Sequence, residues 1–207
     1  MITAGPTWVP IDTVRVISNV STGETGILLA KEAKKQGAKV TLLLGPVGDK
    51  TLDNSVRVIR FRTFSELKER LIKELHLRKY DVVIHSAAVS DYRTKRIFKS
   101  KIKSGLKVLR LELIPTSKII DLIKRVDSSL FLAAFKFETQ ASKQKLIHES
   151  RLLLARTGSD LIVGNTILRN RYSAYLISKG EIQGPELSKE KMAWALINRI
   201  GELICKN

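Results

Sequence analysis

Short apolar runs alternate with longer amphipathic segments along this chain, and this alternation constrains its fold more than any other feature. Apolar runs at 39–45, 80–89, 130–135 and 160–165 have the length and composition of buried strands, and helix patterns separate them. Strands that alternate with helices usually pair in parallel, because each helix returns the chain to the end of the sheet where the next strand starts. The sequence therefore predicts an α/β fold with a mostly parallel sheet.

The remaining elements complete a Rossmann-like three-layer sandwich, with helices on both faces of the sheet. Periodicity predicts helices at 23–36, 64–77, 116–126, 138–157 and 188–204, and further strands at 1–4, 56–61 and 106–113. Residues 173–183 are typical of a hairpin. Residues 45–54 are rich in turn formers, and the basic segment at about 92–112 is expected to form a flap. No linker-like stretch interrupts residues 1–207, so a single domain is expected.

Composition argues against several classes of protein. The chain contains no run of eighteen apolar residues, so neither a membrane span nor a membrane partner is expected. Its first residues lack the basic and apolar regions of a signal peptide. Cys205 is the only cysteine, which rules out a disulfide within the chain and favours a cytoplasmic location.

The net charge of +17, from 37 basic and 20 acidic side chains, favours a negatively charged partner, although a solvated surface would account for much of it. Nucleic acid is one such partner, and a small polyanion such as a nucleoside triphosphate is another. Aromatic residues make up only 6% of the chain and the basic residues are dispersed, which argues against a single-strand binding surface. We therefore expect no nucleic-acid partner. Salt-dependent gel shifts would instead support a nucleic-acid partner.

In a sheet of this kind, ligands bind outside the carboxyl ends of the strands. Four places directly follow strand signals: Gly5 to Thr7, Ala87 to Asp91, Phe135 to Glu138, and Asn165. The helix that begins near Gly23 is expected at the same rim. Its free N–H groups and the positive end of its dipole would attract an anion such as phosphate. Glycines and hydroxyls also cap helices that bind nothing, so both interpretations stay open.

Several residues at this rim have a size, charge or ring that suits a ligand-binding site. Ala87 and Ala88 have no bulk, so a ligand can approach their main chain, and Asp91 either contacts it or caps a turn. The KIK segment at 101–103 places two lysines on one face of an extended chain. Phe135 would either stack on a base or fill the core.

Six segments, taken in order, carry a family resemblance. They are TAGPTWVPID (3–12), RVISNVSTGETG (15–26), AAVSDYR (87–93), KIK (101–103), FKFET (135–139) and DLIVGN (160–165). Together they resemble phosphopantothenoylcysteine synthetase, the ligase of coenzyme A biosynthesis. The resemblance covers nearly the whole chain.

The resemblance implies a ligase that joins 4′-phosphopantothenate to L-cysteine. A nucleoside triphosphate, with CTP expected and ATP as the alternative, would activate the carboxylate as an acyl-nucleotidylate and release pyrophosphate. The cysteine amine would then displace the nucleoside monophosphate. Mg²⁺ would accompany the triphosphate, through ligands that the sequence does not identify. No flavin is expected in this chain, although many relatives carry a flavin-dependent decarboxylase domain upstream. Family members are dimers, so a homodimer in which the partner chain completes the site is expected.

By similarity, the catalytic residues are Asn19 and Lys101. Asn19 would contact phosphopantothenate and the acyl-nucleotidylate, and Lys101 would neutralise charge on the triphosphate and on pyrophosphate. The nucleotide contacts implied by the family are Gly5, Ser21, Gly23, Gly26, Asp91, Lys101, Phe135 and Asn165. The implied phosphopantothenate contacts are Asn19, Ala87, Ala88 and Asp91.

Three segments depart from the family pattern. Ser104 replaces the final lysine of the KIKK motif. FKFET resembles the eukaryotic and archaeal pattern more than the bacterial FAAET, which leaves the choice between CTP and ATP open. RTGSD at 156–160 lacks a lysine directly before its glycine, although Arg156 stands one residue earlier.

An NAD(P)-dependent oxidoreductase is the alternative function for such a sheet. It would need an acidic residue for the ribose near the end of the second strand, and residues 42–48 contain none. Tyr175 and Lys179 match a Tyr-x-x-x-Lys spacing, but in a hairpin context instead of a helix. A Walker-type site is disfavoured because GPVGDKT at 45–51 lacks the Gly-Lys pair, and the three scattered histidines lack metal-ligand spacing.

Overall fold

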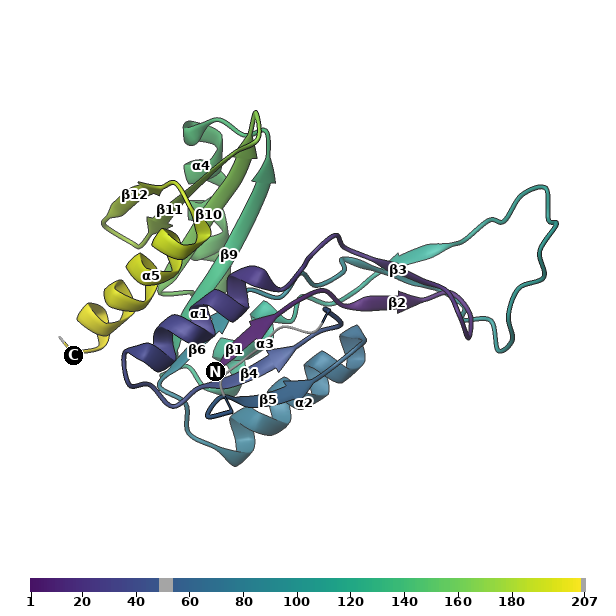
Figure 1. The fold of residues 1–207 in the computed structure, drawn as a ribbon, viewed down its shortest axis with the longest axis horizontal. Helices are drawn as coiled ribbons and strands as arrows, with labels where there is room; N and C mark the ends of the chain where they lie inside the picture. The colour runs from purple at the N-terminus through teal and green to yellow at the C-terminus, as the bar shows by residue number, and fades with distance from the viewer. Residues whose placement is uncertain (49–53, 206–207) are drawn as a thin grey trace.

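A central sheet of eight strands runs through the molecule in the order β12-β11-β10-β9-β6-β1-β4-β5 (Figure 1). The computed structural model describes residues 1–48 and 54–205, so part of the turn-rich segment predicted at 45–54 lies outside the described residues. β11 and β12 are antiparallel at one edge, and the other six strands are parallel, as predicted. The strands are β1 (Ile2–Ala4), β4 (Thr41–Leu44), β5 (Arg57–Arg60), β6 (Val82–His85), β9 (Phe131–Thr139), β10 (Leu161–Leu168), β11 (Arg171–Ile177) and β12 (Ile182–Glu186).

Helices cover both faces of the sheet, which confirms the predicted three-layer sandwich. One face carries α1 (Glu24–Lys35) and α5 (Lys189–Ile204), and the other carries α2 (Phe64–Leu77), α3 (Ile120–Val126) and α4 (Lys143–Thr157). No helix in the described part of the chain combines the length and the apolar character that a membrane crossing requires.

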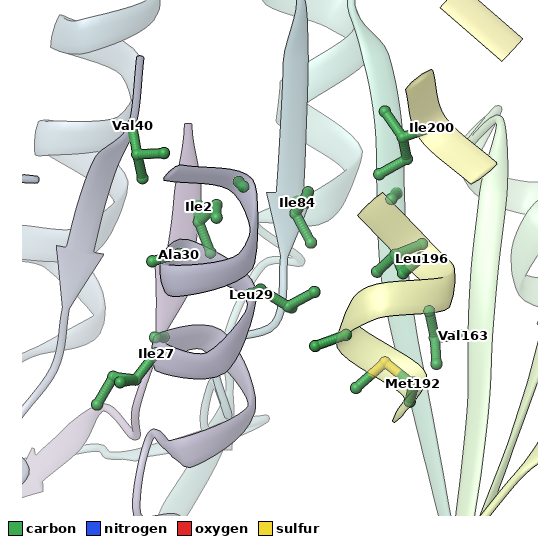
Figure 2. Close-up of a cluster of buried hydrophobic side chains, with 14 of the residues drawn as sticks. Ile2, Ile27, Leu29, Ala30, Val40, Ile84, Val163, Met192, Leu196 and Ile200 are labelled. Carbon is green, nitrogen blue, oxygen red and sulfur yellow. The ribbon is translucent and has the colours of Figure 1, made fainter. Parts of the chain in front are cut away.

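Strand side chains alternate between two buried clusters, one on each face of the sheet. Ile2 of β1 and Ile84 of β6 pack with Leu29 of α1 in the first cluster (Figure 2). Their neighbours in the chain, Met1 and Val83, belong to the second cluster, beneath α2 and α3. Because both faces of the strands are buried, the strands appear in the sequence as continuous apolar runs.

The path of the chain creates a topological switch point beside β1. From β1 the chain passes to β4 and β5 on one side, and then crosses to β6, β9 and β10 on the other. The connections therefore leave the adjacent ends of β1 and β6 in opposite directions. This divergence opens a crevice at the rim, which is where sheets of this kind bind ligands.

An arm projects from this rim, and it consists of residues 8–18 and 92–115. β2 (Trp8–Pro10) pairs antiparallel with β3 (Val16–Ser18), and β7 (Tyr92–Thr94) pairs with β8 (Leu113–Pro115). The loop between β7 and β8 extends beyond both pairs (Figure 1). The flap predicted at about 92–112 corresponds to most of this second half of the arm.

The strand predicted at 106–113 is wrong except at its last residue. Only Leu113 belongs to a strand, and the preceding residues are irregular. Leu106 and Val108 supply the alternating apolar pattern that suggested a strand, but they are 58% and 69% exposed. The arm carries them away from the main sheet, so the pattern has no described strand to pair with.

Two predicted helices start later than expected. The helix predicted at 116–126 begins at Ile120, because Thr116 bonds instead to the loop after β6. The Thr116 amide donates to the Asp91 carbonyl at 2.9 Å, and its hydroxyl donates to the Ser90 carbonyl at 2.8 Å. The helix predicted at 138–157 begins at Lys143, because β9 continues beyond its predicted end to pair with β10.

Candidate active site at the rim of the sheet

Two of the four predicted rim segments are joined by main-chain hydrogen bonds. The Ala88 amide donates to the Gly5 carbonyl at 2.9 Å, and the Thr7 amide donates to the Ala88 carbonyl at 3.3 Å. The Ser90 amide donates to the Thr7 hydroxyl at 2.9 Å. The segments after β1 and β6 therefore form one rigid floor at the switch point.

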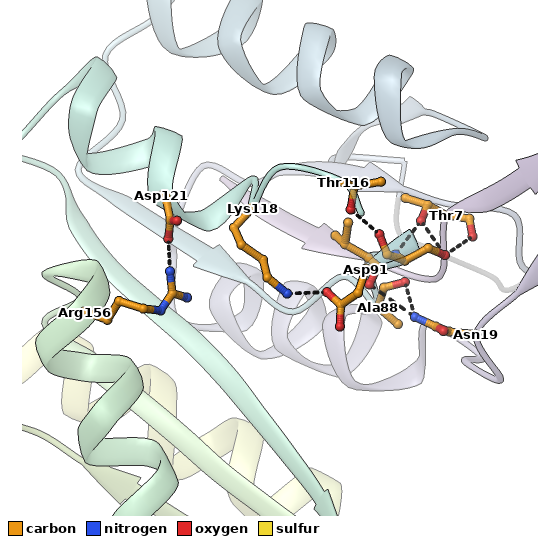
Figure 3. Close-up of polar contacts among 10 residues, drawn as sticks. Thr7, Asn19, Ala88, Asp91, Thr116, Lys118, Asp121 and Arg156 are labelled. Atoms are coloured by element: carbon orange, nitrogen blue, oxygen red, sulfur yellow. Dashed lines mark hydrogen bonds and ion pairs between the residues drawn. The ribbon is translucent and has the colours of Figure 1, made fainter. Parts of the chain in front are cut away.

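Asn19 lies on this floor. Its side-chain nitrogen donates to the carbonyl oxygens of Ala88 at 3.1 Å and of Val89 at 3.3 Å (Figure 3). Asn19, Ala88 and Asp91, which the sequence assigned to one substrate, thus lie together although Asn19 is about seventy residues from the other two. An oxyanion would have to compete with these two carbonyls for the amide hydrogens of Asn19.

The start of α1 lies against the same floor. Gly23 caps the helix without a side-chain cap, and both Gly23 and Gly5 have positive φ angles, of 69° and 80°. A Cβ atom on Gly23 would lie 3.5 Å from the Gly5 backbone and 3.0 Å from Val47. Glycine at both positions therefore lets the helix terminus approach the end of β1, as a phosphate site requires. Ser21, also assigned to the nucleotide, accepts only a long bond, of 3.4 Å, from the Gly23 amide.

Gly26 faces the interior instead of the rim. A Cβ atom there would come within 2.3 Å of the Ala4 Cβ atom and 2.8 Å of the Ser86 hydroxyl. The residue allows α1 to pack closely on β1, and it shapes the nucleotide side of the site only indirectly.

A cavity of about 580 Å³ opens on the α3–α4 side of the floor. Its size is typical of small-molecule sites. Asp91 and Lys118 form an ion pair at 2.5 Å on one side, and Arg156 pairs with Asp121 at 2.6 Å on the other (Figure 3). The remaining lining is His85, Ala87, Val89, Thr116, Ser117, Ile119, Ile120, Phe135, Lys136, Glu149, Leu152 and Leu153.

Phe135 and Asn165 lie within strands, and not after them as predicted. β9 and β10 pair with each other as far as Ile167, well beyond the level at which β6 ends. The carboxyl edge of the sheet therefore extends further at β9 and β10 than at β6. Phe135 is partly buried against the cluster beneath α1 and α5. The Asn165 Oδ1 atom is buried without a hydrogen-bond partner among the described residues, as is the Tyr172 hydroxyl. Burial raises the pKa of Tyr172.

Lys101 lies on the arm and is exposed. Its neighbour Ile102 is fixed to the β2–β3 turn, because the Ile102 amide donates to Asp12 Oδ2 at 3.0 Å and its carbonyl accepts from Arg15 at 3.2 Å. The arm extends away from the floor (Figure 1), and no hydrogen bond or ion pair joins Lys101 to Asn19 or Asp91 among the described residues.

Comparison with known proteins assigns the family. The family model described as the C-terminal domain of the DNA/pantothenate metabolism flavoprotein matches residues 1–203. This chain belongs to that family. A solved DNA/pantothenate metabolism flavoprotein from Streptococcus pneumoniae superposes with a TM-score of 0.86 at 26% identity, over 98% of this chain and 97% of that one.

Several relatives are named coenzyme A biosynthesis bifunctional protein CoaBC, and two of them show the extent of the match. The protein from Thermococcus kodakarensis is 44% identical over 81% of this chain and 41% of its own length. The protein from Borreliella burgdorferi is 32% identical over 93% of this chain and 50% of its own length. The chain therefore spans about half the length of these relatives.

Within this family domain, the structure adds two residues that sequence reasoning did not assign to the site. Asp12 organises the arm: four hydrogen bonds, led by the Ile102 amide, hold the pKa of its carboxyl well below the usual range. An Asp followed by a tight turn is a sequence signal for part of this pattern. His85 lines the cavity, and burial lowers its pKa to about 4. Only the pairing of β1 with β6 reveals its position.

The described residues contain no group of three or more His, Cys, Asp and Glu side chains placed to hold a metal ion.

Proposed function

We propose that this chain is a phosphopantothenate–cysteine ligase, which joins 4′-phosphopantothenate to L-cysteine in coenzyme A biosynthesis. The observation that carries the proposal is the junction of Asn19 with Ala88 at the switch point, directly beside the start of α1. The family assignment supports it, as do the names of the relatives.

The proposed reaction is activation followed by amide formation. A carboxylate is a poor acyl donor because its oxygen leaves badly, whereas a nucleoside monophosphate leaves well. The triphosphate would lie on the α1 side, with its phosphates near Gly5, Ser21 and Gly23 and its base near Phe135 and Asn165. The buried, unpaired Asn165 Oδ1 atom supports this placement, because a base with an amino group would satisfy it. Mg²⁺ would be held mainly by the phosphates, as is common for this ion.

The pantothenoyl carboxylate would lie over Asn19, Ala87, Ala88 and Asp91. There it would face the nucleotide across the switch point, so that the two substrates meet where β1 and β6 end. The cysteine amine would then attack the acyl-nucleotidylate. CTP is the proposed nucleotide and ATP the alternative.

We further propose a homodimer in which the arm of each chain reaches the site of its partner. Exposed apolar side chains are concentrated on the arm, and they would be covered by a second copy. They are Val14, Val16, Ile17, Tyr92, Ile97, Leu106, Val108, Leu109 and Leu113. In this arrangement Lys101 would serve the partner's triphosphate. A flavin-dependent decarboxylase domain upstream and a cytoplasmic location complete the proposal.

Pyrophosphate release tests the proposed function. Purified protein with 4′-phosphopantothenate and Mg²⁺ should release pyrophosphate from CTP more readily than from ATP, and cysteine should sustain turnover. Release that does not depend on 4′-phosphopantothenate would overturn the ligase assignment. A change in NADH fluorescence on mixing would instead favour the oxidoreductase.

A further inference from the structure

The side-chain amide of Asn19 has a fixed orientation. Its nitrogen donates to the carbonyl oxygens of Ala88 at 3.1 Å and of Val89 at 3.3 Å (Figure 3). The opposite orientation would place the amide oxygen, Oδ1, against the same two carbonyl oxygens, with no hydrogen between them. The floor therefore engages the amide hydrogens of Asn19, and the group that remains for a ligand is Oδ1.

This oxygen is open to a ligand. Asn19 is exposed, and no donor among the described residues forms a hydrogen bond with Oδ1. Because the oxygen and the nitrogen branch from the same planar carbon, Oδ1 points away from the two carbonyls that hold the nitrogen. The rim thus presents a neutral acceptor at Asn19, whereas stabilisation of an oxyanion requires a donor.

Thr7 and Ser90 fix the loop that imposes this orientation. The Thr7 hydroxyl accepts from the Ser90 amide at 2.9 Å and donates to the Ser90 hydroxyl at 3.3 Å. The Ser90 hydroxyl donates to the Thr7 carbonyl at 3.3 Å, and the Thr7 amide donates to the same Ala88 carbonyl that Asn19 uses. Both residues are buried, so breaking this pair would leave polar groups unsatisfied. The pair therefore holds the Ala88 and Val89 carbonyls in one arrangement.

The chemistry of the proposed reaction identifies the donor that meets Oδ1. Around its reacting carbon, the acyl-nucleotidylate carries an acyl oxygen and phosphate oxygens, which accept hydrogen bonds. The reacting group that carries hydrogens is the amine of cysteine. An acceptor beside the acyl carbon therefore suits the nucleophile, and holding a nucleophile in line with its target is a large source of rate enhancement.

We propose that Asn19 Oδ1 accepts a hydrogen bond from the neutral cysteine amine and orients it towards the acyl carbon, and that Thr7 and Ser90 are the positioning residues behind Asn19. The proposal rests on the proposed function. A nitrogen–carbon bond forms while the carbon–oxygen bond to the nucleoside monophosphate breaks, and that oxygen keeps the electron pair. The amine loses one proton to water as the amide forms. Asn19 holds the other hydrogen without removing it, because a neutral amide is a very weak base.

Two nucleophiles distinguish an acceptor from an oxyanion donor. Asn19→Ala is suitable because Asn19 is exposed, so that its truncation should not prevent folding. In single turnovers, acyl-nucleotidylate formed on the enzyme is mixed with cysteine or with 2-mercaptoethanol, whose thiolate has no hydrogen to donate. The variant should react about a hundredfold more slowly with cysteine, and this loss should exceed the loss with the thiolate at least about tenfold. Equal losses with both nucleophiles would mean that Asn19 stabilises the oxyanion, and would overturn the proposal.

Variants of Thr7 test the positioning role. Thr7→Val removes the hydroxyl at similar volume, and Thr7→Ser keeps it. Thr7→Val should slow amide formation about tenfold more than it slows pyrophosphate release, and Thr7→Ser should restore most of the loss. Thr157→Val is the matched control, because that buried hydroxyl accepts from the Ser159 amide at 3.3 Å just before β10 begins, at the opposite edge of the sheet. Equal slowing of both steps, or an effect confined to the KM for 4′-phosphopantothenate, would contradict this role.

The wild-type protein separates failure of this proposal from failure of the ligase function. If wild type forms the amide and Asn19→Ala slows both nucleophiles equally, only the acceptor role of Asn19 is refuted. If wild type releases no pyrophosphate in the presence of 4′-phosphopantothenate, the ligase function itself is refuted. The comparison of nucleophiles does not need the Thr7 variants, so it stands even if Thr7→Val fails to fold.

Discussion

At the scale of single residues, hydrogen bonds between distant parts of the chain assemble the candidate site. The sequence placed Asn19, Ala88 and Asp91 with one substrate, and the structure brings them together through the bond between Asn19 and the Ala88 carbonyl. The position of His85 at the cavity could not be predicted in the same way. It depends on Thr3, which is 82 residues away and becomes a neighbour only through strand register.

His85 should make stability depend on pH. Its pKa falls from 6.5 to about 4 because burial disfavours the charged ring. The unfolded chain then binds a proton at a higher pH than the folded one, so stability falls as the pH drops from 6.5 towards 4, by about 3 kcal/mol. Urea unfolding across this window should show the loss in wild type and a flatter profile in His85→Gln. The exposed His76→Gln is the control, and identical slopes in all three proteins would refute the prediction.

At the scale of elements, periodic patterns predicted the helices and buried strands well, because both kinds of element bury a regular set of side chains. Pieces without such a period were missed. β2 and β3 are too short to show alternation. Leu106 and Val108 of the arm alternate as in a strand, but they are exposed and belong to no strand. The bounds of β9 also depend on its neighbour β10, which the local sequence does not reveal.

The close packing of α1 on β1 should be sensitive to a single methyl group. Gly26→Ala would place a Cβ atom 2.3 Å from the Ala4 Cβ atom, which forces the helix away from the strand. The expected loss of stability is about 1–3 kcal/mol in chemical denaturation. Gly201→Ala is the matched control: it lies in α5 with nothing within 4 Å of the added atom, and should stabilise by about 0.5–1 kcal/mol. Equal effects of the two substitutions would show that α1 has room to adjust.

Asp12 should control the position of the arm. Asp12→Asn removes the negative charge of the carboxylate, whose Oδ2 atom accepts from the Ile102 amide and from the Arg15 side chain. The segment around Lys101 should therefore become more mobile. Turnover should fall about tenfold or more, and protease cleavage within 95–112 should accelerate. Asp127→Asn alters a similar turn carboxylate, which accepts from the Ser129 amide at 2.9 Å, far from the arm. Unchanged cleavage and turnover in Asp12→Asn would contradict this role.

At the scale of the whole molecule, the arm decides whether one chain can act alone. In one chain the described contacts do not bring Lys101 to the floor, and an apolar, basic arm points away from the body. The net charge of +17 suits the multiply anionic substrates that we propose, but the sequence could not predict which charges would face a partner chain in the proposed dimer.

Mixing two inactive variants should show whether the arm works in the partner. Asn19→Asp and Lys101→Gln should each be nearly inactive alone. A mixed dimer would contain one site with both native residues if Lys101 acts across the interface, so random exchange should restore about a quarter of wild-type turnover. Absence of recovery, with subunit exchange verified by mass, would mean that Lys101 acts within its own chain or not at all.

The most direct test of carboxylate activation at this rim follows one oxygen atom. When the carboxylate of 4′-phosphopantothenate carries a heavy oxygen isotope, an acyl-nucleotidylate transfers one labelled oxygen to the nucleoside monophosphate as cysteine takes the acyl group. Mass spectrometry of the products should therefore find the label in the monophosphate and none in pyrophosphate. Label in inorganic phosphate, or an unlabelled monophosphate formed alongside the amide, would contradict the proposed reaction.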